Sequence, residues 1–401
     1  AAHTPNMDNL AKKGKTGLVF PVTEGIAPES DIAVISLLGY DAHKYYTGRG
    51  PLECFAEGLT VNDGDLALRV NFATVAEDGK TILDRRVGRN LTTEEALALA
   101  KEINSKVKLS KGATFEFKNT IGHRGVLVIR YKDKKLSAGI TNTDPAYGRE
   151  GVFGVAKEKF ENIVAESVPM TGYEKDDDVK LSASLLNEFT LKSHQILKES
   201  SINKKRVLEN KLPANVILAR DAGDHLPKFP FLRELYGINF GSFVQMPVER
   251  GIALLCGIEI VEVPQATGHL DVDYPIWVKL ALESIKKYDG LYIHIKGPDE
   301  PAHDGDYLKK KEVIEAIDRF FFAKLLSKLN LEEIVVAITS DHSTVCKAKA
   351  HTADPVPLLL CGGGILSDGS SYFSEKTASQ GKLGKLKGQE IMPLLVKSAR
   401  E

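Results

Sequence analysis

The second half of the chain alternates between short apolar runs and longer amphipathic segments. From about residue 240 onward, apolar runs of strand length are separated by segments with helical spacing. Strands that alternate with helices are typical of a parallel sheet with helices on both faces. We therefore predict a doubly wound, mostly parallel α/β core. Its expected strands are 243–247, 258–263, 290–296, 334–339 and 357–360, and its expected helices are 248–257, 274–287, 309–329 and 391–399.

The first 60 residues resemble that core in texture, whereas the segment after them differs. Pro5 and Gly14 mark the start and the end of a first helix. A strand at 17–20 and an apolar helix at 32–38 follow. After about residue 60 the strands are longer and two long helices appear. We therefore expect two domains, a discontinuous core of residues 1–60 and 240–401 and an inserted α/β domain of residues 61–239.

Composition limits the class of function. The chain has 53 Lys and Arg residues against 54 Asp and Glu residues, so the basic excess typical of nucleic-acid binding is absent. No apolar run reaches the roughly 18 residues of a membrane-spanning helix. Four cysteines, none in a C-x-x-C pair, are typical of free thiols in a reducing compartment. We expect a cytoplasmic protein that binds neither nucleic acid nor membranes.

Acidic and imidazole side chains follow two of the expected core strands. Ligands of open α/β sheets bind beyond the carboxyl ends of the strands, so we expect these side chains to lie close together. They are Asp299 and His303 after one strand, Asp341 and His342 after another, and His351 in the next loop. Carboxylates and imidazoles suit Zn²⁺ or Mn²⁺, and a two-metal site suits phosphoryl transfer. Each pair alone also has an ordinary interpretation, a loop carboxylate beside a surface histidine.

Ser30 stands at the expected start of an apolar helix. The free N–H groups of a helix start stabilise a phosphate or a developing oxyanion. A serine at this position is most often a helix cap. The alternative is a nucleophile, whose hydroxyl group a nearby metal cluster would activate.

Several segments resemble a known family. TPNMDNLAKKG (4–14) is similar to a helix signature of the alkaline phosphatase superfamily. Within that superfamily, the chain resembles cofactor-independent phosphoglycerate mutase of the archaeal type, from one end to the other. The segments that carry this resemblance are SDIAVISLLGYD (30–41), YTGRGPLE (46–53), PDEPAHDGD (298–306), SDHST (340–344) and GKLGKLKGQEIMPLL (381–395).

The resemblance implies an alkaline-phosphatase-like core with a substrate domain inserted after the serine helix. It implies interconversion of 3-phosphoglycerate and 2-phosphoglycerate in glycolysis and gluconeogenesis, without 2,3-bisphosphoglycerate. Two divalent metal ions, which could be Mn²⁺, Zn²⁺, Co²⁺ or Mg²⁺, would be the cofactors, and Ser30 would become phosphoserine. By motif, Asp299, His303 and His351 would hold one ion, and Asp341, His342 and Ser30 the other.

The inserted domain would bind the carboxylate and hydroxyl groups of glycerate. His123 and Asp144 are candidates for general acid and base. Arginine suits contacts with carboxylate or phosphate groups. The candidates for such anion contacts are Arg124, Arg220, Lys228 and Arg49. Each of these residues has an ordinary alternative as a surface salt bridge or a turn residue.

Three other functions stay open. A metal-dependent phosphomonoesterase would share the core but release inorganic phosphate. A phosphopentomutase-like enzyme would have an insert of different size and topology, and a non-catalytic metal-binding protein is the third possibility. The family also has an Asp in a D-G motif at the end of a first strand. We expect this Asp among residues that precede Ala1.

Overall fold

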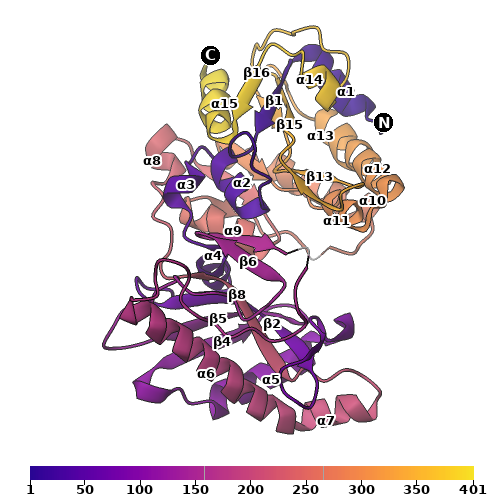
Figure 1. The fold of residues 1–401 in the computed structure, drawn as a ribbon. Helices are drawn as coiled ribbons and strands as arrows, with labels where there is room; N and C mark the ends of the chain where they lie inside the picture. The colour runs from indigo at the N-terminus through magenta and orange to yellow at the C-terminus, as the bar shows by residue number, and fades with distance from the viewer. Residues whose placement is uncertain (158, 265) are drawn as a thin grey trace. The chain divides into compact units, whose positions relative to one another are not determined.

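The computed structural model describes residues 1–157, 159–264 and 266–401 and divides the chain into two compact units (Figure 1). Unit 1 contains Ala1–Tyr46 and Lys228–Glu401, and unit 2 contains Thr47–Pro227. The structure therefore assigns helix α4 (Arg49–Ala56) to unit 2, whereas the sequence analysis placed it in the core. The reason is packing, because Cys54 of this helix lies in a buried apolar cluster with Val126 and Val128 of unit 2.

Unit 1 contains helices and short strands in alternation. Its helices are α1 (Pro5–Lys13), α2 (Ser30–Leu37), α3 (Ala42–Tyr45), α8 (Leu232–Tyr236), α9 (Pro247–Leu255), α10 (Leu270–Ser284), α11 (Asp299–Asp304), α12 (Tyr307–Ala316), η3 (Ile317–Phe322), α13 (Ala323–Leu326), α14 (Glu375–Ala378), η4 (Gly388–Glu390) and α15 (Ile391–Arg400). Its strands are β1 (Lys15–Phe20), β9 (Phe240–Phe243), β10 (Glu259–Ile260), β11 (Gly290–Ile293), β12 (Val336–Ile338), β13 (Ser343–Val345), β14 (Ala350–Thr352), β15 (Val356–Cys361) and β16 (Gly384–Lys387).

The expected α/β class is correct, but the expectation of a mostly parallel core sheet needs a correction. Strands β10, β9 and β11 form a parallel three-stranded sheet. In the four-stranded sheet β12-β15-β1-β16, however, β15 runs antiparallel to both of its neighbours. A hairpin, β13–β14, lies between β12 and β15 in the chain. The chain therefore returns to the sheet without the long crossover that parallel neighbours need.

Helices cover both faces of the four-stranded sheet in unit 1 (Figure 1). Leu10 of α1 packs against Leu359 and Cys361 of β15. Ile391 of α15 packs with Leu358 on the opposite face of the same strand. Successive side chains of a strand point to opposite faces, so β15 is buried on both sides and reads as a continuous apolar run.

Unit 2 is built on an antiparallel sheet of five strands. Besides α4, its helices are η1 (Val87–Arg89), α5 (Thr93–Lys106), η2 (Ser110–Gly112), α6 (Asp177–Glu199) and α7 (Ser201–Leu208). Its strands are β2 (Leu66–Val75), β3 (Ile82–Asp84), β4 (Thr114–Asn119), β5 (Arg124–Arg130), β6 (Tyr147–Glu150), β7 (Phe153–Ala156) and β8 (Val216–Gly223). Leu68, Val70 and Phe72 of β2 pack with residues of α5 and α6. Ala67, next to Leu68 on β2, lies in the cluster that contains Cys54 of α4, so helices cover both faces.

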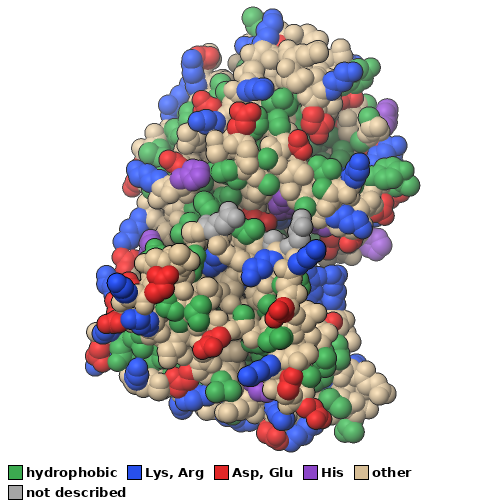
Figure 2. Space-filling model, viewed as in Figure 1, with side chains coloured by type: hydrophobic (Ala, Val, Ile, Leu, Met, Phe, Trp, Pro, Cys, Tyr) green, Lys and Arg blue, Asp and Glu red, His purple; other side chains and the backbone are tan. Residues whose placement is uncertain are grey.

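Charged side chains of both signs are interspersed over most of the face that Figure 2 shows, as the nearly equal numbers of basic and acidic residues predict. Within the described residues, no helix has both the length and the apolar character needed to cross a bilayer.

Candidate active site

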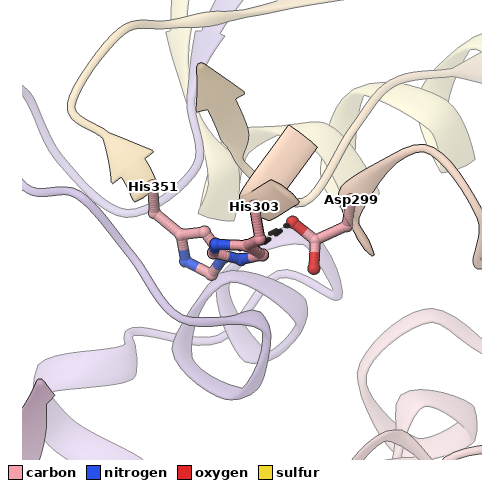
Figure 3. Close-up of side chains that lie close together, drawn as sticks. All are labelled: Asp299, His303 and His351. Carbon is pink, nitrogen blue, oxygen red and sulfur yellow. Dashed lines mark hydrogen bonds and ion pairs between the residues drawn. The ribbon is translucent and has the colours of Figure 1, made fainter. Parts of the chain in front are cut away.

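Residues of unit 1 from distant parts of the sequence form one histidine–carboxylate cluster. Asp299 and His303 lie one turn apart on the short helix α11. His351 comes from strand β14, and all three side chains point toward one another (Figure 3). One potential ligand atom from each residue lies within 4.8 Å of the other two. The structure thus brings together three of the five side chains that were expected after the core strands.

The interatomic distances in this first set are those of a metal site. Nε2 of His303 lies 3.2 Å from Nε2 of His351 and 3.3 Å from Oδ1 of Asp299. The distance from Nε2 of His351 to the same Asp299 oxygen is 3.6 Å. Nitrogen and oxygen ligands about 2 Å from one ion lie about 3.3 Å apart when the coordination is tetrahedral. The donor atoms and their spacing therefore fit one divalent cation.

Backbone carbonyls contact the remaining ring nitrogens. Nδ1 of His303 lies 3.1 Å from the carbonyl oxygen of Lys349, and Nδ1 of His351 lies 2.9 Å from that of Pro28. Such contacts fix the tautomer and the orientation of histidines that bind metals. They leave Nε2 of both rings directed at the shared position beside Asp299.

A second set contains Ser30, Asp341 and His342. Nε2 of His342 lies 3.2 Å from Oγ of Ser30 and 3.3 Å from Oδ2 of Asp341. The His342 ring also stacks on His351 of the first set, with ring centroids 3.7 Å apart. The two sets are therefore contiguous, and the chemistry and spacing of the second also fit a divalent cation.

Ser30 is the first residue of α2, and its contacts bear on the interpretation of this serine as a helix cap. The cap of this helix is Glu29, and no side chain makes a capping hydrogen bond there. The hydroxyl of Ser30 instead contacts His342, and the Ser30 side chain is nearly buried, with 8% exposure. The structure thus places Ser30 in the cluster rather than in a capping role.

The electrostatics favour ionised carboxylates in the cluster. Burial raises the pKa of Asp299, but the contact with His351, the hydrogen bond from Thr344 and the nearby imidazoles together lower it more, so the pKa lies below its ordinary value. Burial likewise raises the pKa of Asp341, but His342, His294 and Lys296 together lower it more. Burial lowers the pKa of His342, which favours the neutral ring that a metal ion requires.

Unit 2 holds an alternating chain of arginines and carboxylates. Arginine–carboxylate contacts of this kind are short because both groups are charged. The successive contacts are Arg49–Glu53 at 2.7 Å, Glu53–Arg69 at 3.0 Å, Arg69–Asp221 at 2.9 Å, Asp221–Arg220 at 3.6 Å, Arg220–Asp144 at 3.2 Å and Asp144–Arg85 at 2.7 Å. Three candidates from the sequence, Arg49, Arg220 and Asp144, are thus members of one network.

The remaining candidates of the inserted domain lie outside this network. His123 lies in the turn before β5, and Arg124 is the first residue of that strand, where it pairs in register with Asn71 of β2. Burial and Arg124 lower the pKa of His123 to about 4, so the ring is neutral near pH 7. Lys228 is the first residue of the second segment of unit 1, whereas Arg220 belongs to unit 2.

Sequence reasoning missed four members of the network, Arg69, Arg85, Glu53 and Asp221. Arg69 offered a signal, because it is a charged residue inside an apolar strand, and charged groups are rarely buried unless they are paired. Its partners depend on strand register, since Arg69 of β2 lies opposite Arg220 of β8. Two adjacent guanidinium groups require carboxylates between them, and Asp221 supplies one.

The α/β fold places a serine at a helix start beside two histidine–carboxylate sets. This arrangement is typical of enzymes that catalyse metal-assisted phosphoryl transfer. Residues 11–203 match the family model described as 2,3-bisphosphoglycerate-independent phosphoglycerate mutase. The mutase of that name from Aeropyrum pernix is 44% identical over 398 residues, which cover 98% of this chain and 92% of the relative. The relative from Thermococcus kodakarensis is 38% identical, with 98% and 90% covered. The chain belongs to the family of 2,3-bisphosphoglycerate-independent phosphoglycerate mutases.

Two solved structures are similar to this fold. A protein from Pyrococcus horikoshii superimposes with a TM-score of 0.79 at 30% identity, covering 100% of this chain and 90% of that one. The cofactor-independent phosphoglycerate mutase from Thermoplasma acidophilum superimposes with a TM-score of 0.63 at 28% identity, covering 99% and 92%. The likeness therefore extends over both units of the chain.

Proposed function

We propose that this chain interconverts 3-phosphoglycerate and 2-phosphoglycerate by passing the phosphoryl group through Ser30, at a site for two divalent metal ions. Membership of the family makes the chain a phosphoglycerate mutase, an isomerase. The observation that carries the route through Ser30 is the 3.2 Å contact between its hydroxyl and His342, within the histidine–carboxylate cluster.

Asp299, His303 and His351 would hold one ion, and Asp341, His342 and Ser30 the other. When bound, the ions would lower the pKa of the serine hydroxyl and offset the negative charge of the phosphoryl group. Such a donor set accepts Mn²⁺, Zn²⁺, Co²⁺ or Mg²⁺ with modest discrimination. The proposal includes no 2,3-bisphosphoglycerate, in keeping with the name of the family model.

The proposed reaction consists of two phosphoryl transfers. Oγ of Ser30 attacks phosphorus, the bond from phosphorus to the substrate oxygen breaks, and phosphoserine and glycerate result. The other hydroxyl group of the retained glycerate then attacks the phosphoserine and restores Ser30. One proton leaves the attacking hydroxyl and one joins the departing oxygen in each transfer. His123 and Asp144 are the proposed proton carriers, and Arg124, Arg220, Lys228 and Arg49 the proposed anion contacts.

In this proposal unit 1 is an alkaline-phosphatase-like core and unit 2 is an inserted substrate-binding domain. The similarity of fold to the Thermoplasma enzyme over 99% of the chain supports it. The proposal also includes a cytoplasmic location. The four cysteines, all free thiols in the structure, suit a reducing compartment.

The test compares the metal-reconstituted wild type with Ser30→Ala and with Ser327→Ala, an exposed serine of the same unit. We expect Ser30→Ala to lose on the order of 10³ or more in mutase turnover and Ser327→Ala to match the wild type. Mass spectrometry of acid-quenched wild type should find phosphate on Ser30. Unchanged turnover in Ser30→Ala would contradict the phosphoserine route. Phosphate release as fast as isomerisation would favour a phosphomonoesterase instead.

A further inference from the structure

The loop that follows β3 contains three arginines that the mechanism above does not use. We call residues 84–90, which contain Arg85, Arg86 and Arg89, the arginine loop. Three of its successive residues, Val87, Gly88 and Arg89, have positive φ angles of 53°, 62° and 55°. Positive φ is an outlier for a β-branched residue such as Val87. Strained positions of this kind concentrate at functional sites, where the surrounding structure maintains them.

The arginine loop is held firmly at both ends. Oδ1 of Asp84 accepts hydrogen bonds from the backbone N–H groups of Arg86 and Gly88, at 2.6 and 3.0 Å. The Val87 side chain is completely buried in the main apolar core of unit 2. Asn90 accepts a hydrogen bond from Nη2 of the buried Arg206, at 2.5 Å. A loop anchored in this way presents its side chains with little further loss of conformational entropy on binding.

The arginine loop lies beside Asp144 and His123, the two proposed proton carriers. Arg85 makes a two-pronged contact with Asp144, with Nε at 2.9 Å from Oδ1 and Nη2 at 2.7 Å from Oδ2. The turn that carries His123 is attached just beyond the loop, because the N–H of Gly122 donates to Oγ1 of Thr93. Burial, Arg124 and Arg86 lower the pKa of His123, and Arg89 acts in the same direction. Guanidinium groups from two segments therefore converge on this imidazole.

Positive charge is in excess at this place. Arg86 and Arg89 are both exposed, and in the described part of unit 2 no salt bridge involves either of them or Arg124. Arg85, in contrast, is fully engaged with Asp144. Arg85 is thus fitted to position Asp144, whereas the guanidinium groups of Arg86 and Arg89 are available to an anion.

We propose that Arg86 and Arg89 bind the carboxylate of the glycerate moiety. This inference rests on the proposed role of unit 2 in substrate binding. The phosphoryl group of the substrate goes to Ser30, whose unit has its own cation-binding cluster, so the negative charge left for unit 2 is the carboxylate. The planar fork of a guanidinium group matches a carboxylate in geometry and charge.

Two competitive inhibitors separate the carboxylate from the phosphoryl group. D-glycerate has the carboxylate without the phosphate, and glycerol 3-phosphate has the phosphate without the carboxylate. The variants are Arg86→Ala and Arg89→Ala, each with its lysine counterpart, in the metal-loaded enzyme. The control is Lys101→Ala, which removes one positive charge from an exposed position of α5. Circular dichroism and urea unfolding report whether each variant folds.

We expect both alanine variants to raise the inhibition constant of D-glycerate about tenfold or more, with that of glycerol 3-phosphate close to wild type. The KM for 3-phosphoglycerate should rise more than kcat falls. The lysine variants should have inhibition constants between those of the wild type and the alanine variants, because lysine keeps the positive charge but lacks the planar guanidinium group. An equal rise for both inhibitors, or no rise for D-glycerate, would overturn the proposal. If Ser30 proves not to be phosphorylated, the proposed function fails, but the inhibition constants still test these arginines.

Discussion

The hydroxyl of Thr344 donates a hydrogen bond of 2.6 Å to Oδ1 of Asp299. The same hydroxyl lies 3.0 Å from Nδ1 of His342, so Thr344 connects the two candidate ligand sets. Loss of a group that orients metal ligands typically costs about 10–100-fold in metal affinity. We expect Thr344→Val to weaken metal binding by this amount, about 10–100-fold, and Thr344→Ser to restore most of it. Calorimetric titration of the metal-free protein with Mn²⁺ or Zn²⁺ measures the effect. Wild-type affinity in a folded Thr344→Val protein would refute the connecting role.

Removal of the metal should destabilise unit 1. Ligands that bind only the folded state stabilise it, by about 2.7 kcal/mol when the free ligand is at 100 times its Kd. We expect a chelator to lower the unfolding midpoint and added Mn²⁺ or Zn²⁺ to restore it. His303→Ala lacks one ligand of the first set. The metal-dependent increase in its unfolding midpoint should therefore be smaller than in the wild type. The same chelator should lower the midpoint of that variant less than that of the wild type, because only the second set keeps all its ligands, and a full metal effect there would count against the assigned ligands.

The sequence predicts part of unit 1 because a strand such as β15 is buried on both faces and reads as an apolar run. The predicted strand 357–360 lies within β15, and the predicted helix 309–329 covers η3, α13 and all but the first two residues of α12. Strand direction was not predictable in the same way, because a hairpin rather than a helix precedes β15. The boundary of unit 2 was missed because the packing of Cys54 depends on contacts distant in sequence.

Part of the candidate site was also predictable from the sequence, and part of it was not. Asp299 and His303 follow the same expected strand, so their proximity was predictable, whereas the helix that places them on one face was not predicted. The arginine–carboxylate network was not, because Arg69 and Arg220 meet only through the register of β2 with β8. The strained backbone of Val87 left no trace in composition or periodicity. Such a conformation follows from tertiary packing, which buries this side chain completely.

Acid should weaken unit 2 through Glu53. Burial raises the pKa of Glu53, but Arg69 and Arg49 lower it more, from 4.5 to about 2. A carboxylate with a depressed pKa in the folded state stabilises the protein above its unfolded pKa. The contribution is lost as the pH falls from 4.5 through about 2. We expect Glu53→Gln to cost about 3 kcal/mol at neutral pH and to flatten the loss of stability below pH 4.5. Urea unfolding at neutral pH measures the first effect, and unfolding between pH 4.5 and about 2 measures the second. Glu94→Gln, at an exposed position of α5, is the control and should keep the wild-type slope.

The titration of His123 reports on the arginine loop. Burial and nearby arginines lower its pKa from 6.5 to about 4. The folded state therefore loses stability as the pH falls from 6.5 toward 4, because the unfolded chain takes up the proton first. We expect Arg86→Ala to move the pKa of His123 toward its ordinary value, since one repelling charge is removed. Titration of the imidazole protons by NMR measures the shift. An unchanged pKa in this variant would place Arg86 away from His123.

Arg206 should couple the stability of unit 2 to the arginine loop. Its side chain is only 1% exposed and donates to Glu95 at 2.6 Å, to the carbonyl oxygen of Leu212 at 2.9 Å and to Asn90 at 2.5 Å. Removal of one partner from a buried ion pair typically costs about 3–5 kcal/mol. We expect Arg206→Met to lower the free energy of unfolding by about 3 kcal/mol, measured with urea. Because Asn90 ends the arginine loop, the KM for 3-phosphoglycerate should also rise, while metal affinity in unit 1 stays unchanged. Val207→Ala, at the neighbouring exposed position, is the matched control. A loss of stability with a wild-type KM would mean that Arg206 supports the helices of unit 2 without holding the loop.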